Sequence, residues 1–295
     1  MPYAPCDICG AVEATVVLRS PRLDGPLVRC GRCGLLYVGE RGHDFTFLAS
    51  DPGCTSALGE LVEELGIVAR DVESAEHPQR LEAERERARR LRRHIGSGRL
   101  LDVGCATGSF LSVVCESFTA EGVEPDPGTA EQARARGLIV NTGTLEQLTA
   151  PAGGFDAVTM FHVIEHLASP RAALSRVFDL LAPGGVLLIE TPTADNLWFR
   201  LAPQRWRQLI PDHYFFFSRA TLERLLRDCG FDPVDHVKVG RRVSVRFAID
   251  RLRRAGVPGA RVIGRALERT ALAERTVYLN PGDIMQLVAI KRRSR

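Results

Sequence analysis

Short apolar runs alternate with amphipathic helical segments from about residue 98 to the end of the chain. Apolar runs of strand length lie at 99–103, 120–123, 138–141, 155–160, 186–190, 235–239 and 284–291. Helical periodicity occupies the intervals, starting at Ser109 and covering 129–136, 170–181 and 221–229. Strands that follow one another through helices predict an α/β fold, a doubly wound sheet with helices on both faces.

The chain before residue 97 has a different pattern. Residues 42–96 contain no strand signal, and apolar positions at 58, 61, 62, 65 and 68 have helical spacing. Pro78 separates them from a charged helix predicted over 79–95. We therefore predict three parts: a module over 1–40, a helical linker or lid over 41–96, and a main domain over 97–295.

Four of the eight cysteines form two closely spaced pairs in the first module. Cys6 and Cys9 make one pair, Cys30 and Cys33 the other, and a short β-like stretch at 14–18 lies between them. Two-residue spacing lets both thiolates of a pair reach one tetrahedral ion, so the pattern predicts a Cys₄ zinc ribbon with structural zinc. The alternative is four unrelated reduced cysteines, and the remaining four are expected to be small buried apolar residues.

The segment 98–126 has the layout of a nucleotide-binding βαβ unit. A strand ending at Asp102 leads into a small-residue turn from Gly104 to Gly108, then a helix, then a strand ending at Glu124. A dinucleotide fingerprint needs glycine at the first, third and sixth turn positions, and here Ala106 and Ser109 occupy the last two. The turn is therefore poorly suited to bind a pyrophosphate. The alternative to a ligand site is an ordinary βα turn whose glycines serve only the backbone geometry.

The turn resembles motif I of the class I S-adenosylmethionine-dependent methyltransferases, and Glu124 matches their ribose-binding acid. The similarity extends over about 99–240 and the last strand. Further segments that resemble successive landmarks of the small-molecule members lie at 155–158, 161–167, 181–185 and 212–218. The predicted zinc ribbon also resembles that of a subgroup of these methyltransferases. This resemblance implies a Rossmann-like seven-stranded sheet whose last strand is antiparallel.

The resemblance also implies a site for the methyl donor, S-adenosylmethionine. Asp102 and the backbone of Gly104, Ala106 and Gly108 are expected to hold the methionine end, and Glu124 the ribose. These positions follow the carboxyl ends of strands, where ligands bind in open α/β sheets.

The residues expected beside the adenine and at the open end of the site lie in later loops. Thr144 and Leu145 are expected to flank the adenine. Phe161 or His162, just beyond the fourth strand of the main domain, is expected to lie against the donor.

Three histidines are candidate bases because their intrinsic pKa lies near neutrality. We favour His213, in an aromatic-rich loop on the acceptor side, followed by His166, which comes after Glu165 on a loop facing the expected cleft. His162 is more readily explained as a packing or hydrogen-bonding residue.

The predicted function is methyl transfer to a small acceptor. We favour a hydroxyl of a sugar or secondary metabolite, with N- and C-methylation open. Two alternatives are retained: an RNA methyltransferase, and a non-catalytic donor-binding or scaffold protein. The net charge of +3 is too small to imply nucleic acid. The chain has neither a signal-peptide pattern nor an apolar run of membrane-spanning length, so we expect a cytoplasmic protein.

One stretch departs from the compact pattern. About forty residues, 241–280, are inserted between the last two strands, and residues 241–275 carry ten arginines against three acids. We expect a helical cap or a contact in a homo-oligomer, with a surface for anionic substrates or membrane headgroups as the alternative.

Overall fold

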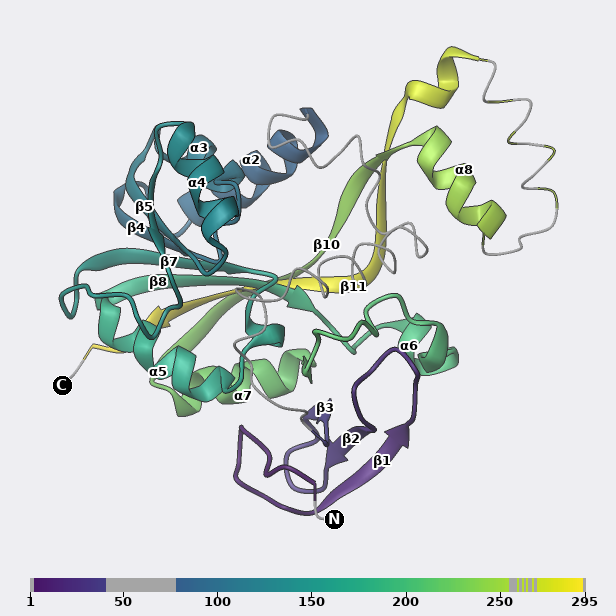
Figure 1. Cartoon of the computed structure of the whole chain (residues 1–295), viewed down its shortest axis with the longest axis horizontal. Coiled ribbons are helices and arrows are strands. Elements are labelled where there is room, and N and C mark those ends of the chain that lie inside the picture. Colours follow the sequence, from purple (N-terminus) through teal and green to yellow (C-terminus); the bar gives the residue numbers. More distant parts are fainter. Residues whose placement is uncertain are drawn as a thin grey trace.

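The computed structural model describes residues 3–40, 78–254 and 270–293, with isolated positions at 259, 262, 264 and 267. A seven-stranded sheet in the order β10-β11-β8-β7-β4-β5-β6 forms its centre (Figure 1). Strand β11 is antiparallel to both of its neighbours, while the remaining pairs are parallel. This arrangement confirms the predicted sheet and its antiparallel last strand.

The strands coincide with the predicted apolar runs. Their bounds are β4 (Gly98–Val103), β5 (Phe118–Glu124), β6 (Ile139–Thr142), β7 (Phe155–Phe161), β8 (Leu181–Pro192), β10 (Phe231–Ser244) and β11 (Thr276–Lys291). The central strands β4, β7 and β8 are buried over nearly continuous runs, because helices cover both sheet faces. The landmark segment at 181–185 is the first part of β8, which begins directly after the helix predicted over 170–181.

In the described part of the chain, helices cover both faces of the sheet. Helices α2 (Pro78–Arg92), α3 (Ser109–Val114) and α4 (Pro127–Ala135) lie on one face, and α5 (Pro170–Leu180) and α7 (Arg219–Asp228) on the other (Figure 1). Ser169 is the N-cap of α5, and its side chain accepts from the Ala172 amide, while Ser218 caps α7 in a capping box. The helix predicted over 58–68 falls outside the described residues.

The cysteine module is joined to the main domain by a shared sheet. Strands β1 (Ala14–Leu18), β2 (Leu27–Cys30) and β3 (Leu36–Val38) continue into β9 (Phe215–Phe216), where Leu36 pairs with Phe216 and Tyr37 with Phe215. The Val38 amide also donates to the Tyr214 carbonyl at 2.9 Å. The module therefore fixes the loop that contains His213.

A second contact joins the first cysteine turn to α5. The Asp7 carboxylate accepts from the Ser169 hydroxyl at 2.6 Å and from the Arg171 amide at 2.7 Å. Arg171 in turn donates to the Asp7 carbonyl at 3.0 Å. Because α5 follows the loop that carries His166, the module contacts both histidine-bearing segments.

The predicted insertion begins and ends as strand. Strands β10 and β11 stay paired as far as Ser244 and Thr276, and α8 (Val245–Arg254) follows directly. The paired strands form an arm that carries α8 away from the sheet (Figure 1). Among the described residues, no helix combines the length and the apolar character needed to cross a membrane.

Candidate active site

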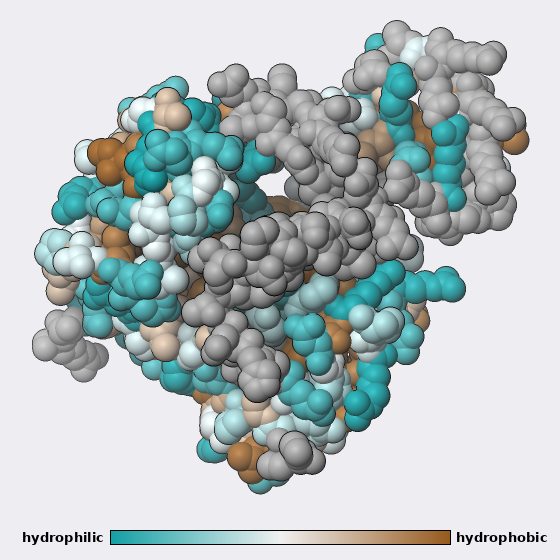
Figure 2. Space-filling view, in the orientation of Figure 1, coloured by the Kyte–Doolittle hydropathy of each residue, from teal (hydrophilic) through white to brown (hydrophobic). Residues whose placement is uncertain are grey.

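A cavity of about 1110 Å³ opens at the carboxyl ends of β4, β7 and β8. Helix α2 forms one wall, and the arm of β10, β11 and α8 forms the opposite wall. Figure 2 shows the surface hollowed in this region. Of the predicted site residues, the described wall includes Asp102, Gly104, Ala106, Phe161 and His162.

The glycine turn is held by backbone contacts to β5. The amide of Gly104 donates to the Val123 carbonyl at 2.8 Å, and Gly104 has a φ of 69°. A Cβ at this position would lie 2.6 Å from a Val163 methyl carbon, so the turn requires glycine there. Gly108 also has a positive φ, of 77°, and it packs against Leu138.

Glu124 fastens the turn to the end of β5. Its Oε2 accepts from the Ala106 amide at 2.9 Å, and its Oε1 accepts from the Asp126 amide at 3.0 Å. Burial raises the pKa of Glu124, although both amide contacts favour the carboxylate. Each oxygen keeps a second lone pair, so the carboxylate can still accept from vicinal hydroxyls.

Asp102 lies on the cavity wall but is almost fully buried. Its Oδ1 accepts from the Thr159 hydroxyl at 2.6 Å across the β4–β7 pair. Burial raises the pKa of Asp102 to about 7, more than the Thr159 contact lowers it. Near neutral pH this carboxyl group is therefore partly protonated and can donate as well as accept.

The remaining predicted donor contacts lie in two places. Phe161 is on the wall, with its ring 4.8 Å from that of Phe110 and 4.5 Å from the guanidinium carbon of Arg87. Thr144 and Leu145 lie outside the described wall, on a loop tied to β5 by a 2.9 Å bond from the Gly143 amide to the Glu124 carbonyl.

His162 occupies a strained position between two carboxylates. Its φ is 56°, uncommon for a residue with a Cβ, and such strain concentrates at functional sites. Its Nε2 lies 3.0 Å from Glu190 Oε1 and its Nδ1 lies 3.4 Å from Glu165 Oε1. Burial opposes its charge, but the two carboxylates outweigh that effect and raise the pKa of His162 to about 9.

His166 and His213 form a second, more buried pair. Their ring centroids are 4.7 Å apart at 76°. The Nδ1 of His213 lies 2.9 Å from the Gln208 carbonyl, and burial with the nearby His166 lowers the pKa of His213 to about 3. In the described part of the chain, Nδ1 of His166 is buried without a hydrogen-bond partner. Neither ring lines the described cavity wall.

The sequence prediction omitted the ion pairs beside His162. Glu190 on β8 pairs with Arg87 of α2 and accepts from Gln286 of β11 at 2.5 Å, while Arg87 also binds Glu84 at 2.9 Å. Burial opposes ionisation of Glu190, but Arg87 and His162 keep its pKa well below the usual range. Glu190 could have been identified from the sequence, because it is an acid at the end of an otherwise apolar run. Arg87 could not, because it is one of many arginines in a charged helix.

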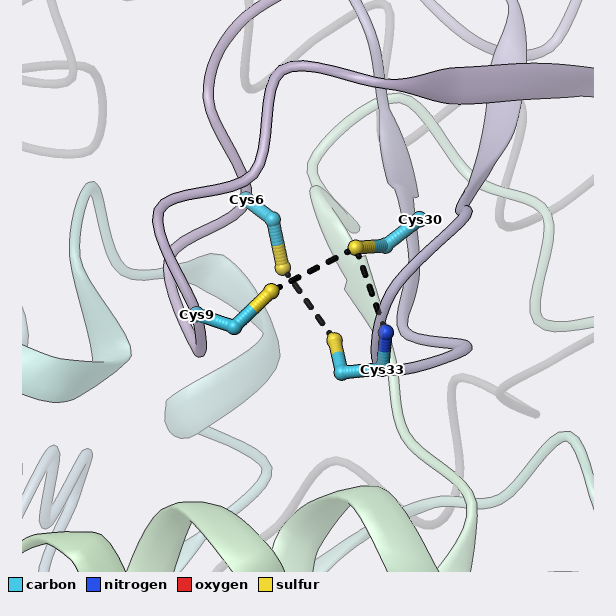
Figure 3. A group of neighbouring side chains, drawn as sticks. All are labelled: Cys6, Cys9, Cys30 and Cys33. Atoms are coloured by element: carbon cyan, nitrogen blue, oxygen red, sulfur yellow. Dashed lines mark hydrogen bonds between the residues drawn. The ribbon is translucent and has the colours of Figure 1, made fainter.

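The four paired cysteines converge on one point (Figure 3). The Sγ atoms of Cys6 and Cys33 are 3.4 Å apart, those of Cys9 and Cys30 are 3.5 Å apart, and all four lie within 4.8 Å of one another. Tetrahedral zinc with Zn–S bonds of about 2.3 Å places sulfurs about 3.8 Å apart. The donor set therefore fits a closed structural zinc site.

Zinc removal is predicted to loosen the His213 loop. Protein prepared without chelators should contain about one zinc per chain, and Cys9→Ser should lose it. Amides of β9 should then exchange hydrogen faster, because β3 no longer holds them. Metal analysis and hydrogen exchange measure both effects, with the exposed Cys115→Ser as control. Metal-free protein with unchanged β9 exchange would contradict the coupling.

The pH dependence of stability is predicted to report on His162. Its pKa in the folded protein lies above the unfolded value, so its stabilisation is complete below about pH 6.5 and is lost as the pH rises through about 9. The difference in unfolding free energy between wild type and His162→Gln should therefore shrink from about pH 6.5 to about pH 9.5. Urea unfolding at both pH values measures it. A difference that stays constant would contradict this electrostatic account.

Comparison with known proteins gives a consistent assignment. A family model described as a methyltransferase domain matches residues 75–236. A probable S-adenosylmethionine-dependent methyltransferase of Mycolicibacterium smegmatis is 32% identical over 150 residues, covering 50% of this chain and 57% of that protein. A ubiquinone biosynthesis O-methyltransferase of Cereibacter sphaeroides is 33% identical over 155 residues, covering 46% and 61%. The chain thus spans roughly three fifths of these relatives.

Solved structures share the fold. A methyltransferase from Thermotoga maritima superimposes with a TM-score of 0.51 at 20% identity, covering 81% of this chain and 97% of that one. The [4+2]-cyclase SpnF gives 0.51 at 19% identity, covering 82% and 95%. The fold alone therefore does not fix the reaction. The family model covers more than half of the chain, and the chain belongs to the class I S-adenosylmethionine-dependent methyltransferase family.

Proposed function

We propose that the protein transfers the methyl group of S-adenosylmethionine to a hydroxyl of a small acceptor, such as a sugar or a secondary metabolite. One observation carries the donor half: Glu124 at the end of β5 is joined to the Ala106 amide of the glycine turn. This arrangement supports a role for Glu124 as the ribose acid, because its carboxylate lies beside backbone that can approach a ligand closely. The homologous ubiquinone biosynthesis enzymes are named O-methyltransferases, which supports oxygen as the accepting atom.

The donor's methyl group is bound to a positive sulfonium and is already activated for displacement, so the enzyme mainly aligns the two reactants. We propose that Gly104, Ala106, Gly108 and Asp102 hold the methionine end. In its protonated form Asp102 can donate to the donor carboxylate, which an ionised carboxyl group would repel.

The other predicted contacts complete the donor site. Thr144 and Leu145 follow β6 on the loop tied to Glu124, which supports an adenine position there. Phe161 and His162 line the cavity at the end of β7, and we propose that they flank the sulfonium end.

For the acceptor proton we propose the pair His166 and His213. Burial and the nearby His166 lower the pKa of His213 to about 3, so His213 is neutral but a weak base, and the neighbouring Glu165 carboxylate would have to stabilise its protonated form. His166 has a buried nitrogen without a partner among the described residues, and Glu165 lies beside both rings. The Glu165 carboxylate also contacts His162 on the cavity wall at 3.4 Å. A proton leaving the cavity thus has a short polar route toward the pair.

The segments outside the donor site also have proposed roles. We propose that 1–40 is a zinc-stabilised module and that the helix of 78–92, the described part of the predicted linker 41–96, leads into the main domain of 97–295. We also propose that 241–280 serves the acceptor side or an oligomer contact. The pairing of β3 with β9 supports a role for zinc in holding the acceptor loop.

Glu124→Ala is predicted to weaken donor binding. Loss of the ribose contacts and of the Ala106 anchor should raise the Kd for S-adenosylmethionine by about tenfold to a hundredfold. Calorimetry measures the change, and Glu121→Ala on the same strand is the matched control. Wild-type protein that binds neither S-adenosylmethionine nor S-adenosylhomocysteine would overturn the proposed function.

Histidine variants test the proposed base. In an acceptor screen that measures homocysteine after hydrolysis of the S-adenosylhomocysteine product, His166→Gln and His213→Gln should each lower kcat by about a hundredfold. Their donor Kd should stay within about twofold of wild type. Should both variants keep wild-type kcat while His162→Gln alone is inactive, the base is His162. Methylation of RNA without methylation of any small molecule would favour the rival function.

A further inference from the structure

Three side chains with metal-binding atoms converge away from the cysteine site. Glu165, His166 and His213 each place one ligand atom within 4.8 Å of those of the other two. Glu165 and His213 are buried, while His166 is partly exposed and leaves a path from solvent. None of the three lines the described wall of the active-site cavity, so they form a separate polar group beside it.

Two of these ligand atoms have no hydrogen-bond partner in the described part of the chain. They are Oε1 of Glu165 and Nδ1 of His166, and both are buried. The Nδ1 of His162 lies 3.4 Å from the Glu165 oxygen, an ion-pair contact without the geometry of a hydrogen bond. A buried carboxylate oxygen and a buried imidazole nitrogen without hydrogen bonds have a high desolvation cost, which a bound cation would offset.

Neighbouring residues orient the other two ligands of the group. The Gln208 carbonyl lies 2.9 Å from Nδ1 of His213 and can only accept, so Nδ1 carries the proton and the neutral ring has its free lone pair on Nε2. The Thr191 hydroxyl donates to Oε2 of Glu165 at 2.9 Å and leaves Oε1 available. Outer hydrogen bonds of this kind fix the tautomer and the orientation of metal ligands in proteins.

The two segments that carry the ligands are joined to each other. The Tyr214 amide donates to the Glu165 carbonyl at 2.9 Å, and the ring centroids of His166 and His213 are 4.7 Å apart. Ligands of one ion with bonds of about 2.1 Å lie about 3 to 4 Å apart, so the three atoms must approach one another by no more than about 2 Å. Rotation of the side chains can supply a movement of this size.

We propose that Glu165, His166 and His213 form a second metal site, which binds a divalent transition-metal ion such as Zn²⁺ and thereby inhibits methyl transfer. Imidazole nitrogens with one carboxylate favour such ions over Ca²⁺ and Mg²⁺, which prefer oxygen ligands. Three protein ligands leave at least one coordination position for water. The cysteine site differs, because its four thiolates make a closed set.

Inhibition follows from the atoms that the ion would occupy. The ion binds nitrogen lone pairs, and the proposed proton acceptor uses lone pairs of the same two rings, His166 and His213. The ion and the acceptor proton therefore compete. This part of the inference rests on the proposed function, whereas binding of the ion can be measured without turnover.

Cobalt is the probe for the second site. Wild-type protein that retains zinc in its cysteine site should bind about one further Co²⁺ per chain in calorimetry. The bound Co²⁺ should absorb weakly in the visible range, without the intense near-ultraviolet band that thiolate ligands produce. X-ray absorption at the cobalt edge should show nitrogen and oxygen ligands and no sulfur. Both spectra use wild-type protein and do not depend on a variant.

Variants assign the ligands. Glu165→Gln and His213→Gln should each raise the Kd for Co²⁺ by at least about tenfold. His236→Gln is the matched control, because Nε2 of His236 is also buried without a partner among the described residues but belongs to no group of metal ligands there. Thermal melting verifies that the variants are folded. Added Co²⁺ should slow formation of S-adenosylhomocysteine by wild type and by His236→Gln in parallel with its binding.

Three results overturn the second metal site: no further Co²⁺ bound by wild type, sulfur ligands around the further ion, or equal Co²⁺ binding by wild type and His213→Gln. Binding of Co²⁺ without inhibition overturns the competition with the proton. Normal Co²⁺ binding by a protein that methylates no acceptor removes the proposed function and leaves the metal site in place.

Discussion

The carboxylate of Glu124 links the two strands that carry the proposed donor site. It lies at the end of β5 and accepts from the Ala106 amide in the turn after β4, so the turn and the acid keep a fixed relation. Parallel pairing of β4 with β5 brings their carboxyl ends to the same edge of the sheet. Burial works against ionisation of Glu124, and the two amide contacts work in its favour. The proposed site is thus preorganised by backbone geometry together with the Glu124 carboxylate.

A second polar network spans the neighbouring strands. Glu190 on β8 binds Arg87 of α2, His162 after β7 and Gln286 of β11, and so joins four elements at the cavity. A buried carboxylate is tolerated only when such partners surround it. The contacts of this network hold His162 in an unfavourable backbone conformation and offset the energetic cost of that conformation. On the opposite side, the cysteine module supports the His166 and His213 segments through Asp7 and β3.

Local patterns were sufficient to predict most of the fold. Apolar runs between helices predicted every strand of the main sheet, and the spacing of cysteines predicted a group that the structure brings together. The turn with Glu124 was predictable because its parts are close in sequence. The pairing of β3 with β9 was not, since 177 or more residues separate partners such as Tyr37 and Phe215, and no local signal reports that contact. For the same reason Arg87 could not be distinguished from other arginines of α2 until β8 was placed against it.

The donor site at the glycine turn is the central claim, and amide hydrogen exchange with and without S-adenosylhomocysteine tests it most directly. Bound ligand should slow exchange at amides 104–108 and 124–126 and in the 143–145 loop, because these segments enclose it. Exchange in β1 and β2 of the cysteine module should stay unchanged. Protection confined to other segments, with none in the turn, would contradict the account.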